Sequence, residues 1–185
     1  MEKVEREESK KTNLGKGLAY IALFCALTVV CSWISVPTPV PFTLSTFALF
    51  LAVCVLGARD ALFVALAYVA LGLVGVPVFA GFQAGFSALF NGTGGYILGY
   101  IIGGGVMWLM ELLPVKKGKK IIALTAGLLT YYLCGTLWYA LVFVQGAVGI
   151  TAALLTCVLP FILPDVAKII VAVIIGKKIN QRRGK

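Results

Sequence analysis

The sequence contains no histidine. That absence excludes histidine-based acid–base catalysis, serine–histidine triads, the H-E-x-x-H zinc site and histidine-ligated haem. Charged residues are also scarce, at 12% of the chain, whereas 61% of the residues are hydrophobic. A soluble domain has roughly 25% charged and 45–50% apolar residues, so this composition is typical of a protein whose surface faces lipid.

Motifs for metal binding, redox chemistry and ATP hydrolysis are missing as well. The five cysteines lie singly in apolar runs, without the paired spacing of metal or redox sites, and we interpret them as small buried hydrophobic residues. No G-x-x-x-x-G-K-[ST] phosphate loop occurs. Residues 1–16 lack the apolar stretch and cleavage site of a secretory signal. We therefore expect no catalytic residues, no metal, no cofactor and no enzymatic activity.

Three long segments, residues 17–58, 61–110 and 121–164, carry no charge. A helix that rises ~1.5 Å per residue crosses the ~30 Å hydrocarbon layer in about 20 residues, so each segment is long enough for two crossings. Proline and glycine mark an uncharged turn within each segment, at residues 37–41, 76–92 and 145–149. The sequence predicts an all-α integral membrane protein with six transmembrane helices in a compact bundle.

The basic residues indicate the orientation of that bundle. Every lysine and arginine except Lys168 lies in the N-terminal segment, at Arg59, between residues 116 and 120, or after Gly176. By the positive-inside rule, this side and both termini are cytoplasmic. We thus interpret the net charge of +9 as a topological signal and expect no nucleic-acid partner. The predicted parts are a polar cytoplasmic tail (1–16), a transmembrane substrate-binding domain (17–176) and a basic cytoplasmic tail (177–185).

Small residues recur at four-residue spacing in several predicted helices. They are Ala22 and Ala26, Ala61 and Ala65, and Gly95, Gly99 and Gly103. Such faces allow helix backbones to approach closely. Packing inside the bundle is the simpler interpretation for each face, and docking of a partner is the alternative.

Two charged residues stand inside the last hydrophobic segment. Asp165 and Lys168 are three positions apart, which places them on one face of a helix. Each ionisable group in a membrane costs roughly 2.5–3.5 kcal/mol, so the pair either neutralises itself structurally or serves a function. Pro160 and Pro164 lack the N–H of other residues, and the irregular backbone they cause is tolerated only beside protein or a cavity. We expect the pair to line a cavity, and we interpret Glu111, near the cytoplasmic lysines, as structural.

Residues 79–96 combine aromatic rings, glycines and amides, a composition typical of a small-molecule pocket. Gln83 and Asn91 are the candidates there for contacts with an uncharged ring system. An aromatic belt at the lipid interface would explain the phenylalanines and tyrosines equally well.

Four motifs together resemble one family. They are Pro-x-Pro-x-Pro-Phe-Thr at 37–43, Gly-x-Pro-Val-Phe-Ala-Gly at 75–81, Gly-Thr-Gly-Gly-Tyr at 92–96 and Asp-x-x-Lys at 165–168. The sequence resembles BioY, the biotin-specific S component of energy-coupling-factor (ECF) transporters, over residues 18–179. The resemblance implies high-affinity biotin capture at a multi-pass protein of the bacterial cytoplasmic membrane. It also implies association with a transmembrane coupling protein and two cytoplasmic ATPase subunits.

The resemblance assigns roles to particular residues. It implies that Asp165 and Lys168 bind the ureido ring of biotin, and it nominates Asn91 and Tyr96 as pocket residues beside Gln83. Ala22 and Ala26 resemble the small-residue motif that S components present to the coupling protein. Two other functions stay open: an S component for a different vitamin, and a membrane scaffold or assembly protein without a ligand, in which the pair fixes helix register. An enzyme using Asp165 or Glu111 would lack any accompanying nucleophile or metal site.

Overall fold

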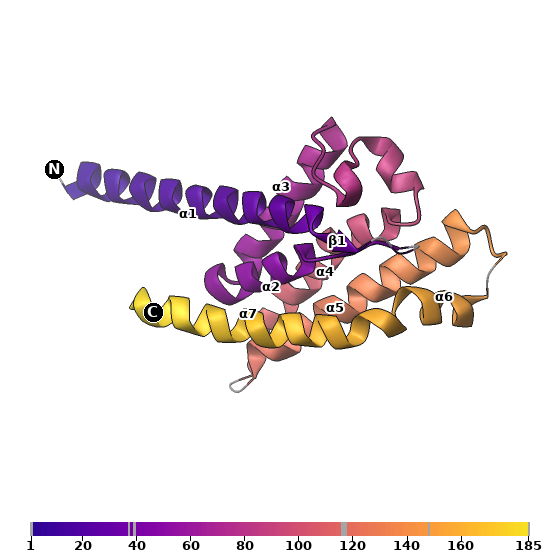
Figure 1. Ribbon diagram of the computed structural model, residues 1–185. Helices are drawn as coiled ribbons and strands as arrows, with labels where there is room; N and C mark the ends of the chain where they lie inside the picture. Colours follow the sequence, from indigo (N-terminus) through magenta and orange to yellow (C-terminus); the bar gives the residue numbers. More distant parts are fainter. Residues whose placement is uncertain (1, 37, 39, 116–117, 148, 185) are drawn as a thin grey trace.

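The computed structural model describes residues 2–36, 38, 40–115, 118–147 and 149–184. Within that part of the chain, six helical segments form an elongated bundle, as Figure 1 shows. They are α1 (Glu2–Trp33), α2 (Ser45–Leu56), α3 (Ala58–Val74), α4 (Gly94–Leu112), α5 (Lys119–Trp138, continued by a π-helical turn, η3, Tyr139–Phe143), and the bent pair α6 (Ile150–Cys157) and α7 (Ile162–Arg182). The prediction of an all-α bundle of six helices is confirmed.

Four of these segments are long and apolar enough to cross a membrane: residues 15–33, 94–112, 119–143 and 151–182. The predicted crossing before Arg59 is shorter than expected, because α2 has only 12 residues and a length of about 18 Å. Helix α1 begins at Glu2 and α7 ends at Arg182, so both predicted polar tails are helical extensions of membrane helices. The division of the chain at residues 16 and 176 stays a prediction.

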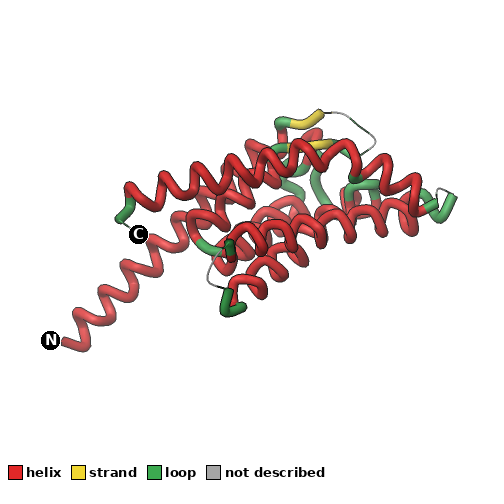
Figure 2. The backbone as a smooth tube through the Cα atoms, turned by 90° about the horizontal axis from the view of Figure 1, so that it is seen from below, coloured by secondary structure: helices red, strands yellow, loops and turns green. Residues whose placement is uncertain are grey.

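The two chain ends lie at the same end of the bundle in both views (Figures 1 and 2). The α2–α3 junction also belongs to this end, and the loop 76–93 and the turn at 144–149 lie toward the other. This arrangement agrees with the predicted topology; the assignment of the terminal end to the cytoplasm rests on the basic residues. Of the predicted signals, Pro37, Pro39, Lys116 and Lys117 lie outside the described residues.

Glycines on α4 bring α4 and α5 into close contact. A Cβ atom on Gly103 would lie 3.0 Å from the carbonyl oxygen of Gly127, and one on Gly95 would lie 2.5 Å from that of Cys134. Ala61 and Ala65 on α3 are buried too. These two small-residue faces therefore pack inside the bundle, whereas Ala22 and Ala26 on α1 are exposed.

A short hairpin links α1 to α2. Strands β1 (Ser35–Val36) and β2 (Phe42–Thr43) pair antiparallel, with Ser35 opposite Thr43 and Val36 opposite Phe42. Helix α2 begins two residues later, so the hairpin fixes the position of its start.

At the other end of α2, one residue separates two helices. Gly57 has φ +101° and ψ 160°, a conformation that favours glycine, and the chain turns there directly into α3. The free N–H of Ala58 at the start of α3 donates to Oε2 of Glu111 at 2.8 Å. Glu111 is thus a helix cap, and its structural role on α4 agrees with the interpretation from the sequence.

Replacing Glu111 with alanine is expected to lower the free energy of unfolding by about 1–2 kcal/mol, as loss of an N-terminal helix cap does in other proteins. Glu111→Gln keeps an oxygen that accepts the same hydrogen bond, so a smaller loss is expected. The measurement is the unfolding midpoint in detergent micelles. Leu112→Ala, at the exposed neighbouring position, is the control. Equal losses in all three variants would contradict the capping role.

Candidate ligand-binding site

The bend between α6 and α7 places an acid at the start of a helix inside the bundle. A 3-10 turn, η4 (Leu159–Phe161), interrupts the segment, and Pro160 and Pro164 have no N–H to continue a regular helix. Asp165 therefore lies in the first turn of α7, where the helix dipole favours a negative charge. The carbonyl of Cys157, left free at the bend, accepts a hydrogen bond from the hydroxyl of Tyr96 at 3.2 Å.

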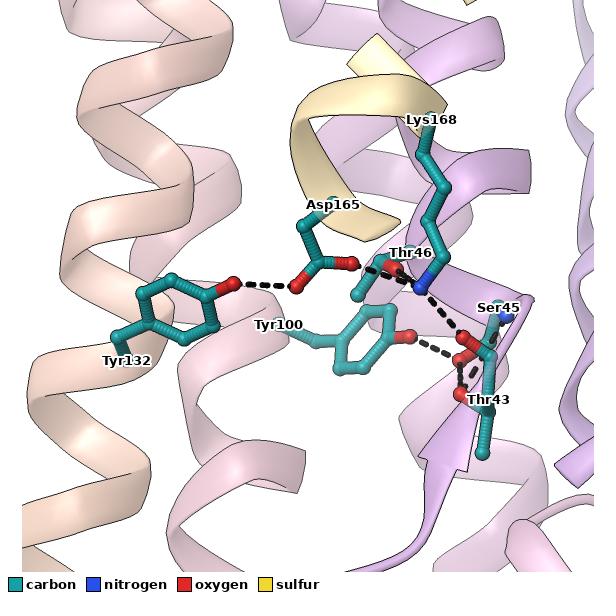
Figure 3. A network of polar contacts seen from close by, with 7 residues as sticks. All are labelled: Thr43, Ser45, Thr46, Tyr100, Tyr132, Asp165 and Lys168. Carbon is teal, nitrogen blue, oxygen red and sulfur yellow. Dashed lines mark hydrogen bonds and ion pairs between the residues drawn. The ribbon is translucent and has the colours of Figure 1, made fainter. Parts of the chain in front are cut away.

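Asp165 and Lys168 form a buried ion pair. Their side chains are 4% and 7% exposed, and Nζ of Lys168 lies 2.7 Å from Oδ1 of Asp165. The same ammonium group donates to the Thr43 carbonyl at 2.7 Å and to Oγ1 of Thr46 at 2.9 Å (Figure 3). These three acceptors match the three N–H donors of a lysine. The pair thus joins α7 to the hairpin and to the first turn of α2.

The second carboxylate oxygen of Asp165 has its own donor. The hydroxyl of Tyr132 on α5 lies 2.5 Å from Oδ2 (Figure 3). A carboxylate has about four acceptor positions, of which two are used here, so Asp165 retains capacity for further N–H donors. Nearby, Ser45 bonds to the hydroxyl of Tyr100 and, at 2.5 Å, to Oγ1 of Thr43. The polar network therefore extends from α5 to α2 and α4.

Tyr132→Phe is expected to reduce the free energy of unfolding by about 1.5–3 kcal/mol, because a buried carboxylate loses one of its two donors. Tyr20→Phe, on an exposed tyrosine of α1, is the matched control and should change nothing measurable. Denaturant titration of the purified protein in detergent checks both. If Tyr132→Phe and Tyr20→Phe have the same free energy of unfolding, the hydrogen bond from Tyr132 to Asp165 contributes nothing to stability.

Aromatic rings surround the ion pair. The Phe42 ring centroid lies 3.8 Å from Nζ of Lys168, a cation–π contact, and the same ring stacks on Phe161 with centroids 5.5 Å apart. Tyr131 contacts Tyr96 at a centroid distance of 4.9 Å and Tyr100 at 5.4 Å. The pair is therefore covered by the hairpin on one side and by a tyrosine cluster on the other.

Two adjoining cavities lie against these groups, with volumes of about 20 and 40 Å³. The first is lined by the ion pair, and the second extends toward Tyr68, Phe79 and Tyr100. Both share a wall whose residues are Val40, Pro41, Thr43, Tyr96 and Tyr131. Since one water needs roughly 10–15 Å³, each space holds only a few waters. The predicted cavity beside the pair exists, but a ring system enters only if the lining moves.

The structure brings together three of the five predicted binding residues: Asp165, Lys168 and Tyr96. Gln83 and Asn91 are exposed, bond to each other at 3.3 Å, and line neither cavity. Gln83 follows the 3-10 turn η1 (Ala80–Phe82), and Asn91 follows the 3-10 turn η2 (Phe86–Phe90). Residues 83–85, with Gly85 at φ +79°, separate the two turns, and this arrangement holds both amides on the surface. Their prediction as pocket residues does not fit this arrangement.

The hydrogen-bond partners of the ion pair outside α7 are not among the residues predicted from the sequence to bind the ligand. They are Thr43, Thr46 and Tyr132. Tyr131, which lines the cavity beside the pair, was not predicted either. The consecutive tyrosines in α5 were the available signal, because polar hydroxyls in an uncharged membrane segment require partners. Among the described residues, no group of three histidine, cysteine, aspartate or glutamate side chains is placed to hold a metal ion.

Ala22 and Ala26 line an apolar groove between α1 and α3. The groove has a volume of about 1000 Å³ and also includes Trp33, Ala70 and Val78. Both alanines are exposed in it.

Comparison with known proteins gives a consistent result. The BioY family model matches residues 5–185. A probable biotin transporter BioY from Pyrococcus horikoshii is 40% identical over 167 residues, which cover 89% of this chain and 96% of that protein. The biotin transporter BioY of Thermotoga maritima is 36% identical over 160 residues, covering 86% and 92%. A crystal structure of the S-component for biotin from an ECF-type ABC transporter shares the fold, with a TM-score of 0.79 and 23% identity over 92% of this chain and 93% of the other. The chain belongs to the BioY family.

Proposed function

We propose that this protein captures biotin for uptake as the S component of an ECF-type transporter. The observation that carries the proposal is the buried Asp165–Lys168 pair, held at 2.7 Å beneath a hairpin and surrounded by aromatic rings. The names of the relatives support the same ligand.

The hydrogen bonding of the pair fits a cyclic urea. The two ring N–H groups would donate to the unused acceptor positions of Asp165. All three donors of Lys168 are engaged, so the ligand carbonyl would replace one existing acceptor. The Thr43 carbonyl is the candidate, because it belongs to the hairpin that covers the site and the exchange substitutes one carbonyl for another. Ligand entry would thereby separate the hairpin from α7.

The surrounding rings fit the rest of the ligand. Phe42 and Phe161 would contact the apolar faces of the bicycle, and the second cavity, toward Tyr68 and Phe79, would accept the aliphatic tail. Tyr96 lines both cavities and would lie between the two parts of the ligand. The engagement of all three Lys168 donors within the protein also fits a ligand-free scaffold, and ligand titration separates the two functions.

The proposal includes partners and a location. We place the protein in the bacterial cytoplasmic membrane, with a transmembrane coupling protein and two cytoplasmic ATPases as its partners. The exposed face of Ala22 and Ala26 supports a contact with the coupling protein, because small residues at four-residue spacing permit close helix packing.

The test is a titration of the purified protein, followed by tryptophan fluorescence and calorimetry, with biotin, riboflavin and thiamine. Saturable binding of biotin alone is expected. 2-Iminobiotin replaces the ureido carbonyl with an imino group that carries a proton, and therefore a positive charge beside Lys168. We expect it to bind at least about tenfold more weakly, the equivalent of one lost charge-assisted hydrogen bond. Equal binding of biotin and 2-iminobiotin would contradict the contact between the ureido carbonyl and Lys168. Absence of biotin binding would favour the scaffold.

A further inference from the structure

Another cavity, larger than the two beside the ion pair, lies at the end of the bundle that carries the chain termini. Its volume is about 410 Å³. Helix α5 begins at its edge, α7 passes along it, and the last turn of α2 closes it. The lining residues are Cys54, Gly118, Lys119, Lys120, Ile121, Val173, Lys177 and Asn180.

Three lysines line this cavity, and no acidic side chain does so among the residues that the structure describes. Lys120 is engaged, because its Nζ donates to the Cys54 carbonyl at 2.6 Å, and Asn180 donates to the same oxygen at 3.0 Å. These two bonds satisfy a carbonyl at the end of α2. Lys119 and Lys177 make no hydrogen bond or ion pair with any described residue. Two ammonium groups from different helices are therefore available beside one cavity.

Helix α5 adds to the positive potential. Lys119 is its first residue, so the unpaired N–H groups of its first turn point to the same end of the bundle as the lysines. Because the candidate membrane span of α5 starts at this residue, we place the cavity at the depth of the lipid headgroups.

The side of the cavity that extends along the membrane span of α5 is apolar. Val173 on α7 and Ile121 on α5, the latter 52% exposed, contribute this part of the lining. An acidic peptide or a free anion would need only the lysines, whereas a lipid presents a phosphate beside the start of an acyl chain. The lining matches that combination.

We propose that this cavity binds the headgroup of an anionic phospholipid, with the phosphate between Lys119 and Lys177 and the upper acyl chain against Ile121 and Val173. The bound lipid would connect α5 and α7 where Lys120 and Asn180 hold the end of α2. It would thus stabilise the bundle at the α2–α3 junction. This inference is independent of the biotin site.

The test uses the full-length protein, freed of native lipid in a neutral detergent. Phosphatidylglycerol, phosphatidylcholine or inorganic phosphate is added, and binding is followed by native mass spectrometry and by thermal unfolding. Phosphatidylglycerol is expected to bind and to raise the unfolding temperature, and phosphatidylcholine is not. Each basic residue near an anionic lipid contributes roughly a fivefold factor, so Lys119→Gln/Lys177→Gln should weaken binding on the order of 25-fold.

The control variant is Lys16→Gln/Lys178→Gln, which removes the same charge from exposed lysines that do not line the cavity. It should retain phosphatidylglycerol binding within about twofold of the original protein. Equal weakening in both double variants would overturn the proposal, because the effect would then be one of net charge. Inorganic phosphate that stabilises the protein as well as the lipid would also overturn it, in favour of a free-anion site. Biotin titration confirms that both variants are folded.

Discussion

Lys168→Met is expected to abolish biotin binding and to be the most destabilising single substitution in the site. Methionine keeps an unbranched side chain but removes the charge, so the Asp165 carboxylate stays buried with Tyr132 as its remaining donor. Removing one partner of a buried ion pair costs about 3–5 kcal/mol. The Thr43 carbonyl and the Thr46 hydroxyl also lose their partner, which loosens the hairpin over the site.

The double variant Asp165→Asn/Lys168→Met separates stability from binding. With both charges removed, no uncompensated charge remains, and the free energy of unfolding should recover most of the loss seen in Lys168→Met. Biotin binding should not recover, because the ureido ring has lost both the carboxylate and the ammonium group. Unfolding in detergent and biotin titration measure the two quantities, and Lys178→Met is the control at an exposed position of the same helix. Biotin binding by the double variant at the original affinity would make the pair purely structural.

The architecture could be predicted from where charge is absent. Long uncharged segments in a membrane imply helices, because every backbone polar group must be satisfied within the segment. The short α2 could not be predicted in this way, since hydropathy does not report the glycine conformation that ends it. Gly57 permits the abrupt turn into α3, and the groups freed there bond to Glu111, Lys120 and Asn180 on other helices. Such distant partners leave no local pattern in the sequence.

The binding site, too, could be predicted from the sequence only in part. Asp165 and Lys168 were identifiable because a charge in an apolar segment is costly wherever the helix lies. Their partners come from far along the chain: Thr43 is 125 residues from Lys168, and Tyr132 is 33 residues from Asp165. The composition of residues 79–96 nominated Gln83 and Asn91, but composition does not specify direction, and the 3-10 turns keep both amides on the surface.

A larger side chain on the exposed alanine face of α1 is expected to weaken assembly strongly. Ala26→Leu should disrupt assembly with the proposed coupling protein while leaving biotin affinity unchanged, because Ala26 lines the α1–α3 groove and touches neither cavity of the binding site. A leucine at a close helix contact holds the backbones apart, and such overpacking costs about 1–3 kcal/mol, roughly a 5- to 150-fold loss of association. Co-purification with a tagged coupling module measures the loss of association. Ala22→Leu is measured beside it and should have the same effect.

The same substitution at another lipid-exposed alanine provides the control. Ala167→Leu, on α7, adds identical apolar volume at an exposed position outside the groove and should leave assembly intact. Loss of assembly in Ala167→Leu as well would show that added surface volume, and not the α1 face, disturbs the complex. Normal assembly of Ala22→Leu and Ala26→Leu would instead place the contact elsewhere. Biotin titration of each variant separates these results from misfolding, because a disordered bundle would not keep the Asp165–Lys168 pair aligned beneath the hairpin.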